Sequence, residues 1–412
     1  MTQDINDRSV VITGIGMVTS LGLSAAETWS GLVAGKTRIR RIQRFDTEGL
    51  ATKFGGELPD AYDGMELEAF PRRMQNQISP SARLGFICAR QAMEDSGFTG
   101  AVYDPYRVAV VTGSGSTGLG DNSADLARPH YAVIRNMANA AAAWISIKHG
   151  LKGASLNVAT ACASGAFAVA LGLDLIRQGR ADAVVVVGMD RMLTRECLGV
   201  FGAILALSEA NDTPEQASRP FDLRRTGFVM AEGGAALMLE AAGPARARGA
   251  RLYARIRGAA MTSEAHNIVA PAMSGEEMAR TMALALTDAG VSPEDIGYVN
   301  AHGTSTQLND AIETQAIKLV FGAHAKRLAV SSVKSMLGHS IGGSGAIECA
   351  ATALALHHRI LTPTINQTDP DPACDLDYVP NVAREAPDLR VALSNSFGFG
   401  GHNCSIVLDR FP

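Results

Sequence analysis

ASLNVATACASGAFAVALGLDLI (residues 154–176) and RLAVSSVKSMLGHSIGGSGAIECAATALAL (residues 327–356) decide the fold of this chain. Each stretch has an apolar run of strand length, then a turn of small residues, then a helical segment rich in Gly, Ser and Ala. Apolar strands alternating with helices predict an α/β architecture with largely parallel, buried strands. Because the same order occurs twice, the sequence also predicts an internal duplication.

The duplication extends outward from these two stretches. Paired segments are VVITGIGMVTS (10–20) with ARIRGAAMTSE (254–264), the helical segments 81–98 and 276–291, RVAVVTGSGSTG (107–118) with IGYVNAHGTSTQ (296–307), and the closing apolar strands 181–189 and 390–401. We therefore expect one half at 1–253 and another at 254–412, stacked as a layered α/β/α/β/α body. Segments 21–80 and 190–253 lack this rhythm, and we expect them to form caps or binding loops.

Composition narrows the class of protein. The chain has 412 residues, of which 47% are hydrophobic and 19% charged, with a formal net charge of −4. This balance is typical of a compact globular protein and gives no field that would draw nucleic acid or a membrane surface. The N-terminus lacks the pattern of a signal peptide, and the six cysteines have no paired spacing. We expect a protein of the reducing cytoplasm without disulfides.

Three residues carry the chemistry that the sequence suggests. Cys162 begins a helix, where partial positive charge and free N–H groups favour a thiolate. His302 and His339 follow apolar strands in the second half. A buried structural cysteine and two turn histidines are the plain alternative, but their matching positions at strand ends favour acyl transfer through a thioester. Neutral imidazoles there can donate N–H groups to a developing enolate, or one can act as a base.

Supporting groups lie nearby in the sequence. Lys334 precedes His339 in an apolar context, so it needs a partner, and Glu348 can pair with it. The glycine-rich turn 397–403 lets the backbone approach the thiol, so an N–H there can complete an oxyanion hole with that of Cys162. A zinc site lacks a third suitably spaced ligand. The dinucleotide-like motif at 113–118 lacks its acidic partner.

Four separated motifs, in order, resemble those of the β-ketoacyl-[acyl-carrier-protein] synthases. They are TACASG (160–165), HGTST (302–306), KSMLGH (334–339) and NSFGFGG (395–401), and the resemblance runs from about Val10 to Leu408. Within the family the chain is similar to the elongating Cys-His-His type, synthase II, and is related to type II polyketide ketosynthases. The resemblance implies the thiolase-like fold and a dimer.

The resemblance also implies the reaction. Cys162 would accept an acyl chain, and His302 and His339 would support decarboxylation of malonyl-carrier protein. The resulting carbanion would attack the Cys162 thioester, extending the chain by two carbons, while the N–H groups of Cys162 and Phe399 hold the oxyanion. No metal or permanent cofactor is implied, because the acyl carrier protein supplies the phosphopantetheine arm.

Further roles follow from the same resemblance. Lys334 and Glu348 match a supporting ion pair, and Phe399 matches a gate whose aromatic partner is Phe228. The remaining matches are Thr304 and Thr306 for the phosphopantetheine arm, Asp310 and Glu313 as structural acids, Arg72 and Arg73 as carrier-protein contacts, and Ser116, Phe201 and Ile341 for the acyl pocket.

Several positions depart from the family pattern. Leu205 and Glu209 stand where basic residues commonly meet the acidic carrier protein, and Val269 and Ala270 replace polar residues beside the arm. These departures favour an acyl pocket and a carrier partner different from those of housekeeping fatty-acid synthesis, while the pathway stays open. The chain can serve fatty-acid elongation, or be the catalytic subunit of a polyketide or polyene synthase paired with a chain-length factor, so that the dimer is a homodimer or a heterodimer. A coenzyme A thiolase would need a second cysteine in the 397–403 turn, and a non-catalytic chain-length factor would lack Cys162.

Overall fold

The two halves of the chain have the same strand order. The computed structural model describes residues 7–99, 102–115 and 129–411. In these residues the main sheet has ten strands in the order β10-β9-β13-β14-β8-β1-β7-β6-β4-β5. The strands of the first half are β1 (Val10–Thr19), β4 (Val108–Gly113), β5 (Ser155–Val158), β6 (Ala183–Asp190) and β7 (Gly233–Ala241). Those of the second half are β8 (Ala254–Ser263), β9 (Tyr298–Asn300), β10 (Ala329–Ser331), β13 (Val391–Gly398) and β14 (His402–Asp409).

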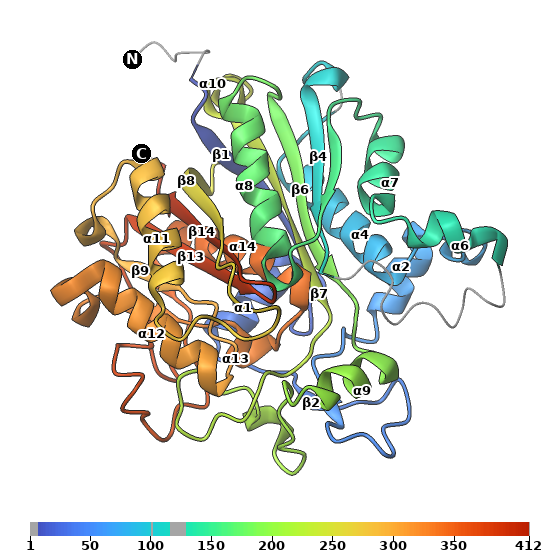
Figure 1. The fold of residues 1–412 in the computed structure, drawn as a ribbon. Coiled ribbons are helices and arrows are strands. Elements are labelled where there is room, and N and C mark those ends of the chain that lie inside the picture. The colour runs from blue at the N-terminus through green and yellow to red at the C-terminus, as the bar shows by residue number, and fades with distance from the viewer. Residues whose placement is uncertain (1–6, 100–101, 116–128, 412) are drawn as a thin grey trace.

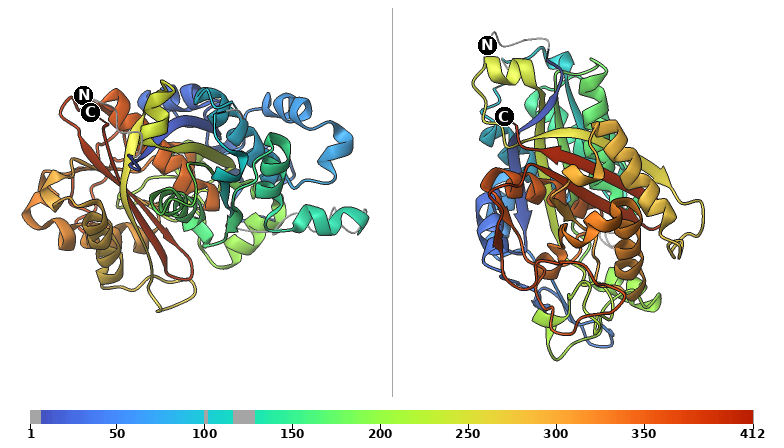
Figure 2. Two further views of the ribbon diagram at one scale, coloured as in Figure 1. Left: turned by 90° about the horizontal axis from the view of Figure 1, so that it is seen from above. Right: turned by 90° about the vertical axis from the view of Figure 1, so that its left-hand side faces the viewer.

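Helices cover both halves and separate them. Figure 1 shows α4 (Pro80–Asp95) and α7 (Ala140–His149) on one outer face, and α11 (Glu276–Ala289) and α12 (Gln307–Phe321) on the other. Between the halves lie α8 (Ser164–Arg177) and α14 (Ser344–His358), which pack against each other and against strands on both sides. The five layers confirm the predicted α/β/α/β/α arrangement. Figure 2 shows α11 and α12 on the opposite side of the molecule from α4 and α7.

The halves join through a short pairing. Val10–Ile12 of β1 pair antiparallel with Ala254–Ile256 of β8. β1 and β8 hold the same place in their halves, so this pairing joins equivalent edges of the two halves. It also brings α8 and α14 together between the two halves. At this contact a Cβ on Gly165 would lie 2.7 Å from the Ala346 nitrogen, so only glycine allows α8 to come this close to α14.

The expectation of largely parallel strands is wrong for the inner strands. Parallel pairing is limited to β5-β4-β6 and β10-β9-β13, whereas β7 and β14 pair antiparallel with both neighbours. The link from β13 to β14 is a short turn, which can join only antiparallel strands.

The segment 190–253 is only partly a cap. It contains the central strand β7 as well as α9 (Arg195–Ala203) and α10 (Ala242–Ala247), so the expectation of caps or binding loops is wrong for β7. Segment 21–80 holds α1 (Ala25–Val33), β2 (Arg40–Arg41), β3 (Phe54–Gly55), α2 (Tyr62–Ala69) and α3 (Arg72–Gln75), outside the main sheet. Within the described residues, no helix has both the length and the apolar character needed to cross a membrane.

Candidate active site

Cys162 lies in a tight turn between β5 and α8. The short 3-10 helix η2 (Ala161–Ala163) begins with Ala161 at φ 49°, an uncommon conformation for a residue with a Cβ. The turn between β13 and β14 comes directly against it, since a Cβ on Gly398 would lie 2.7 Å from the Thr160 carbonyl oxygen. The backbone N–H of Phe399 in this turn donates to Cys162. Two halves of the chain thus meet at the thiol.

The thiol is buried, and burial dominates its acidity. Burial raises the pKa of Cys162 to about 11, although Lys334 and the Phe399 N–H act to lower it. The sequence predicted a thiolate favoured by the start of α8. In the structure the loss of solvent outweighs the groups that stabilise the anion, so the resting residue is a thiol at neutral pH.

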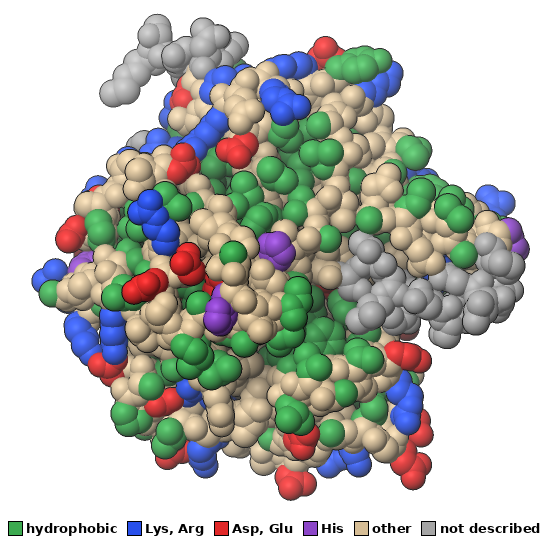
Figure 3. Space-filling view, in the orientation of Figure 1, with side chains coloured by type: hydrophobic (Ala, Val, Ile, Leu, Met, Phe, Trp, Pro, Cys, Tyr) green, Lys and Arg blue, Asp and Glu red, His purple; other side chains and the backbone are tan. Residues whose placement is uncertain are grey.

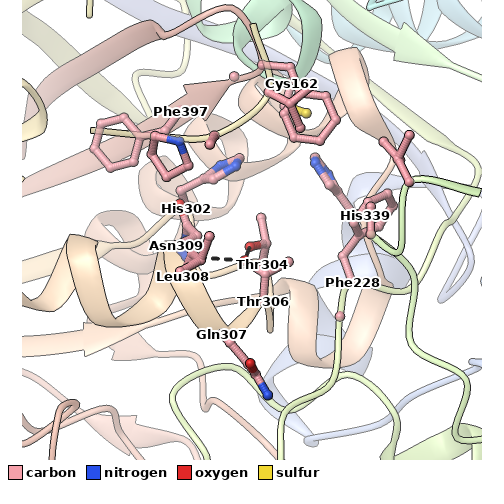
Figure 4. A pocket seen from close by; sticks show the side chains of 18 of the residues that line it. Cys162, Phe228, His302, Thr304, Thr306, Gln307, Leu308, Asn309, His339 and Phe397 are labelled. Atoms are coloured by element: carbon pink, nitrogen blue, oxygen red, sulfur yellow. Dashed lines mark hydrogen bonds between the residues drawn. The ribbon is translucent and has the colours of Figure 1, made fainter. Parts of the chain in front are cut away.

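The two histidines face the same space as Cys162. Figure 4 shows the imidazoles of His302 and His339 directed toward the region below the sulfur. Their ring centroids are 5.5 Å apart with planes at 85°. Burial and the Lys334 cation hold the pKa of both imidazoles well below the usual range, and His339 adds to the effect on His302. Both rings are therefore neutral at pH 7 and can donate through N–H without carrying charge.

Lys334 orients His302 as well as lowering its pKa. The Lys334 ammonium lies 2.6 Å from the His302 carbonyl oxygen and 3.3 Å from its Nδ1. Because an ammonium can only donate, Nδ1 accepts and the ring proton sits on Nε2, toward the cavity. Glu348 on α14 pairs with the same ammonium, as the sequence predicted. Burial raises the pKa of Glu348 to about 7, against the opposing effect of Lys334.

Other groups hold the His339 imidazole and the loop that carries His302. The Ser344 hydroxyl lies 2.8 Å from His339 Nδ1, which leaves Nε2 for the cavity. The Glu313 carboxylate accepts from the backbone N–H groups of His302 and Gly303 at 2.9 and 2.8 Å. Asp310 accepts from the Phe221 N–H at 2.8 Å and lies 3.8 Å from Arg225 Nε. These two acids on α12 hold the surrounding loops rather than reaching the cavity.

A cavity of about 570 Å³ brings these groups together. Phe201, Phe228 and Ile341 line it with Cys162, and the Phe228 ring lies 5.8 Å from Phe201 and 5.3 Å from His339. Thr304 and Thr306 line it below the histidines, with their hydroxyl oxygens 2.9 Å apart (Figure 4). Phe399 also lines it and is half-buried.

Some predicted residues are not at this site. Ser116 lies outside the described residues. Arg72 and Arg73 are exposed on α3, and neither lines the cavity. The sequence analysis in turn missed several lining residues, namely Glu264, Leu308, Asn309, Phe397 and Asn403. Phe397, 5.9 Å from His302, and Asn403 lie in the glycine-rich turn 397–403, whereas Glu264, Leu308 and Asn309 carry no motif of their own.

Comparison with known proteins agrees with this geometry. A model of the β-ketoacyl synthase N-terminal domain matches residues 7–245, and one of the C-terminal domain matches residues 253–368. The chain is 39% identical over 418 residues to 3-oxoacyl-[acyl-carrier-protein] synthase 2 of Synechocystis, covering 99% of both chains. It is 39% identical over 419 residues to the tetracenomycin polyketide synthase ketoacyl synthase alpha subunit of Streptomyces glaucescens, covering 98% of this chain and 97% of that one.

A solved structure is also similar over the full length of this chain. It is a type II polyketide synthase acyl-carrier protein in complex with its ketosynthase bound to the hexaketide, with a TM-score of 0.88, 31% identity, and coverage of 99% of this chain and 100% of that one. The chain belongs to the β-ketoacyl synthase family of condensing acyltransferases, and it has the thiolase-like fold of that family.

Proposed function

We propose that this chain is an elongating 3-oxoacyl-[acyl-carrier-protein] synthase in which Cys162 holds the growing acyl chain. The observation that carries the proposal is the buried Cys162 thiol faced by two imidazoles that burial and Lys334 keep neutral. Such a site suits a thioester and an enolate better than hydrolysis, because its donors stabilise oxygen anions and its walls are largely apolar.

In the first step, the Cys162 sulfur attacks the thioester carbonyl of an acyl-carrier protein. The new carbon–sulfur bond forms as the bond to the carrier thiol breaks, and the thiol proton of Cys162 ends on that carrier thiol. The N–H groups of Cys162 and Phe399 hold the carbonyl oxygen while it carries negative charge.

In the second step, malonyl-carrier protein loses CO₂ and the electron pair remains on the α-carbon as an enolate. His302 and His339 donate N–H groups to the enolate oxygen. The α-carbon attacks the thioester on Cys162, which yields a 3-oxoacyl chain two carbons longer on the carrier and a Cys162 thiolate that takes up a proton from water. Lys334 acts through His302, and Glu348 compensates the charge of Lys334.

Substrate delivery involves the wall below the histidines. Thr304 and Thr306 are placed to bind the phosphopantetheine arm of the carrier, with Phe399 as a gate beside Phe228, and Phe201 and Ile341 contact the acyl chain.

No permanent cofactor is part of this scheme. A second subunit would pair with β5, which ends the sheet and exposes Leu156. The cytoplasmic location remains a prediction from the sequence.

A second candidate is the catalytic subunit of a type II polyketide or polyene synthase, in a heterodimer with a chain-length factor. The similarity to the tetracenomycin ketoacyl synthase alpha subunit favours it as strongly as that to the Synechocystis synthase favours fatty-acid elongation, since both are 39% identical.

The test is intact mass after incubation with acyl-carrier proteins of different chain length and saturation. We expect a mass gain that Cys162→Ala abolishes. Preference for saturated chains supports fatty-acid elongation. Loading with β-keto or polyunsaturated chains, or only with an added second subunit, supports the polyketide or polyene assignment. No mass gain from any carrier would contradict both.

A further inference from the structure

The mouth of the active-site cavity is ringed by exposed apolar side chains. Four of them both line the cavity and remain open to solvent, namely Ile204 (49% exposed), Leu205 (81%), Val269 (45%) and Leu308 (48%), which we call the apolar rim. They come from three segments, which follow α9, follow β8 and begin α12. Figure 3 shows hydrophobic side chains gathered in and around the hollow on this face. Clustered apolar exposure of this kind marks an interaction surface.

Leu205 is the most exposed member of the rim, and its backbone is unusual. Its φ is 55°, in the left-handed region that disfavours side chains with a Cβ, and its N–H donates to the Gly202 carbonyl oxygen. Neither backbone preference nor burial accounts for a leucine at this position. An exposed leucine held in this conformation is what a contact surface for another molecule would require.

The described lining of the cavity contains no lysine or arginine that a partner could reach. Among the described residues that line the cavity, none is Lys or Arg, and the one carboxylate is Glu264. Arg225 runs beneath the Thr306 loop but is 4% exposed, and it is occupied by Asp371 and by the carbonyl oxygens of Thr306 and Gln307. Glu209, four residues after Leu205, is exposed. Arg224 is exposed two residues before the lining residue Thr226, but it is paired with Asp369. An acidic docking face would therefore find no unpaired cation among these described residues.

We infer that the carrier protein docks on the apolar rim through hydrophobic contact rather than through ion pairs. The inference rests on the proposed function, because a carrier-bound thioester can reach Cys162 only through the cavity that this rim surrounds. The partner that fits is a carrier protein with apolar side chains around the serine that bears its arm. Contact of this kind is only weakly screened by salt, whereas ion-pair docking weakens steeply as salt is added.

Reversing the sign of one introduced charge tests the inference. We expect Leu205→Lys and Leu205→Asp each to lower the rate of Cys162 acylation from acyl-carrier protein, both by about tenfold, because either charge must be desolvated on docking. Leu319 on α12 is 54% exposed and does not line this cavity, so Leu319→Lys and Leu319→Asp serve as matched controls, with changes below about twofold. A faster rate with Leu205→Lys and a slower one with Leu205→Asp would overturn the inference in favour of ionic docking.

Salt dependence and a carrier-free substrate complete the test. For the unmodified chain we expect kcat/KM toward acyl-carrier protein to fall less than about twofold between about 50 and about 500 mM NaCl, and Arg72→Glu with Arg73→Glu to have a similarly small effect. A fall above about tenfold in either case would overturn the inference. The acyl thioester of pantetheine bypasses docking, so the Leu205 variants should lose more rate with the carrier than with pantetheine. If the Leu205 variants lose the same rate with the carrier and with pantetheine, hydrophobic docking is overturned but the proposed function is not. If neither substrate acylates Cys162 in the unmodified chain, the proposed function is overturned as well.

Discussion

The turn before α8 in the first half and the turn before α14 in the second half share a backbone but differ in chemistry. Each is a short 3-10 helix, η2 (Ala161–Ala163) or η6 (Ile341–Gly343), and each begins with a residue in the left-handed region, Ala161 at 49° and Ile341 at 48°. In each, a serine that begins the following helix accepts from the N–H four residues before it. The duplicated backbone therefore survives in detail.

The difference lies in what each turn presents. The first turn carries Cys162, whereas the second carries Gly342 at the same place, and the second half adds Lys334 and His339 just before its turn. Asp190 at the end of β6 accepts from the Gly342 N–H at 2.7 Å and the Gly115 N–H at 2.8 Å, which ties the second turn to the first half. The first half thus places Cys162 at the cavity, and the second half places His302 and His339 there, with Lys334 behind His302.

The largest effect that this comparison predicts is a loss of stability when Lys334, the buried cation of the second half, is removed. Lys334→Ala leaves Glu348 buried without its partner, and we expect a loss of about 3–5 kcal/mol in the free energy of unfolding. Urea denaturation measures it. The matched control is Lys326→Ala, which removes an exposed ion pair to Asp375 and should cost below about 1 kcal/mol. Equal losses for the two variants would show that the buried pair is not specially coupled.

The glycine of the second turn should tolerate no side chain. A Cβ on Gly342 would lie 2.1 Å from the Gly115 nitrogen, so we expect Gly342→Ala to cost about 2–3 kcal/mol. Gly64 on α2 has open space around it, and Gly64→Ala should stabilise by about 0.5–1 kcal/mol. Thermal unfolding compares them, and a Gly342→Ala variant as stable as the unmodified chain would mean that the second turn could hold a side chain after all.

The Cys162 thiol of the first turn should ionise only at high pH. Because the pKa of Cys162 is about 11, the thiolate fraction rises with pH throughout the neutral and moderately alkaline range. We expect the rate of iodoacetamide labelling to rise about tenfold per pH unit between about pH 7 and 9. Cys162→Ala gives the background from the other buried cysteines. A plateau at or below about pH 8 would show that the start of α8 and Lys334 outweigh burial.

The smallest expected effects come from Ser164 and Ser344, the serines that begin the two helices after the turns. Ser164→Ala and Ser344→Ala each remove a hydroxyl that holds a turn, so each should cost about 1 kcal/mol of stability. Only Ser344→Ala also releases His339 Nδ1, and it alone should slow CO₂ release from malonyl-carrier protein. Similar CO₂ rates in the two variants would remove Ser344 from the positioning of His339.

Much of the site could be predicted because its residues lie in local patterns. Cys162 and His302 follow the strands β5 and β9, and the duplication implied that such strand ends converge. The expectation of a strand end is wrong for His339, because the short helix α13 (Lys334–Leu337) separates it from β10. The strands β7 and β14 were harder. β7 begins with glycines inside an irregular segment, and β14 follows a glycine turn that looks like an end rather than a reversal. β7 pairs antiparallel with β1, and β14 with β8, and these partners are distant in sequence.

The sequence by itself determined the duplication, the candidate residues for the chemistry and the family, because these reside in short motifs whose order is fixed along the chain. Only the tertiary structure decided the acidity of Cys162 and the apolar rim. Desolvation of the thiol depends on how α8, α14 and the 397–401 turn pack around it, and the rim is assembled from three segments whose exposure no local pattern encodes.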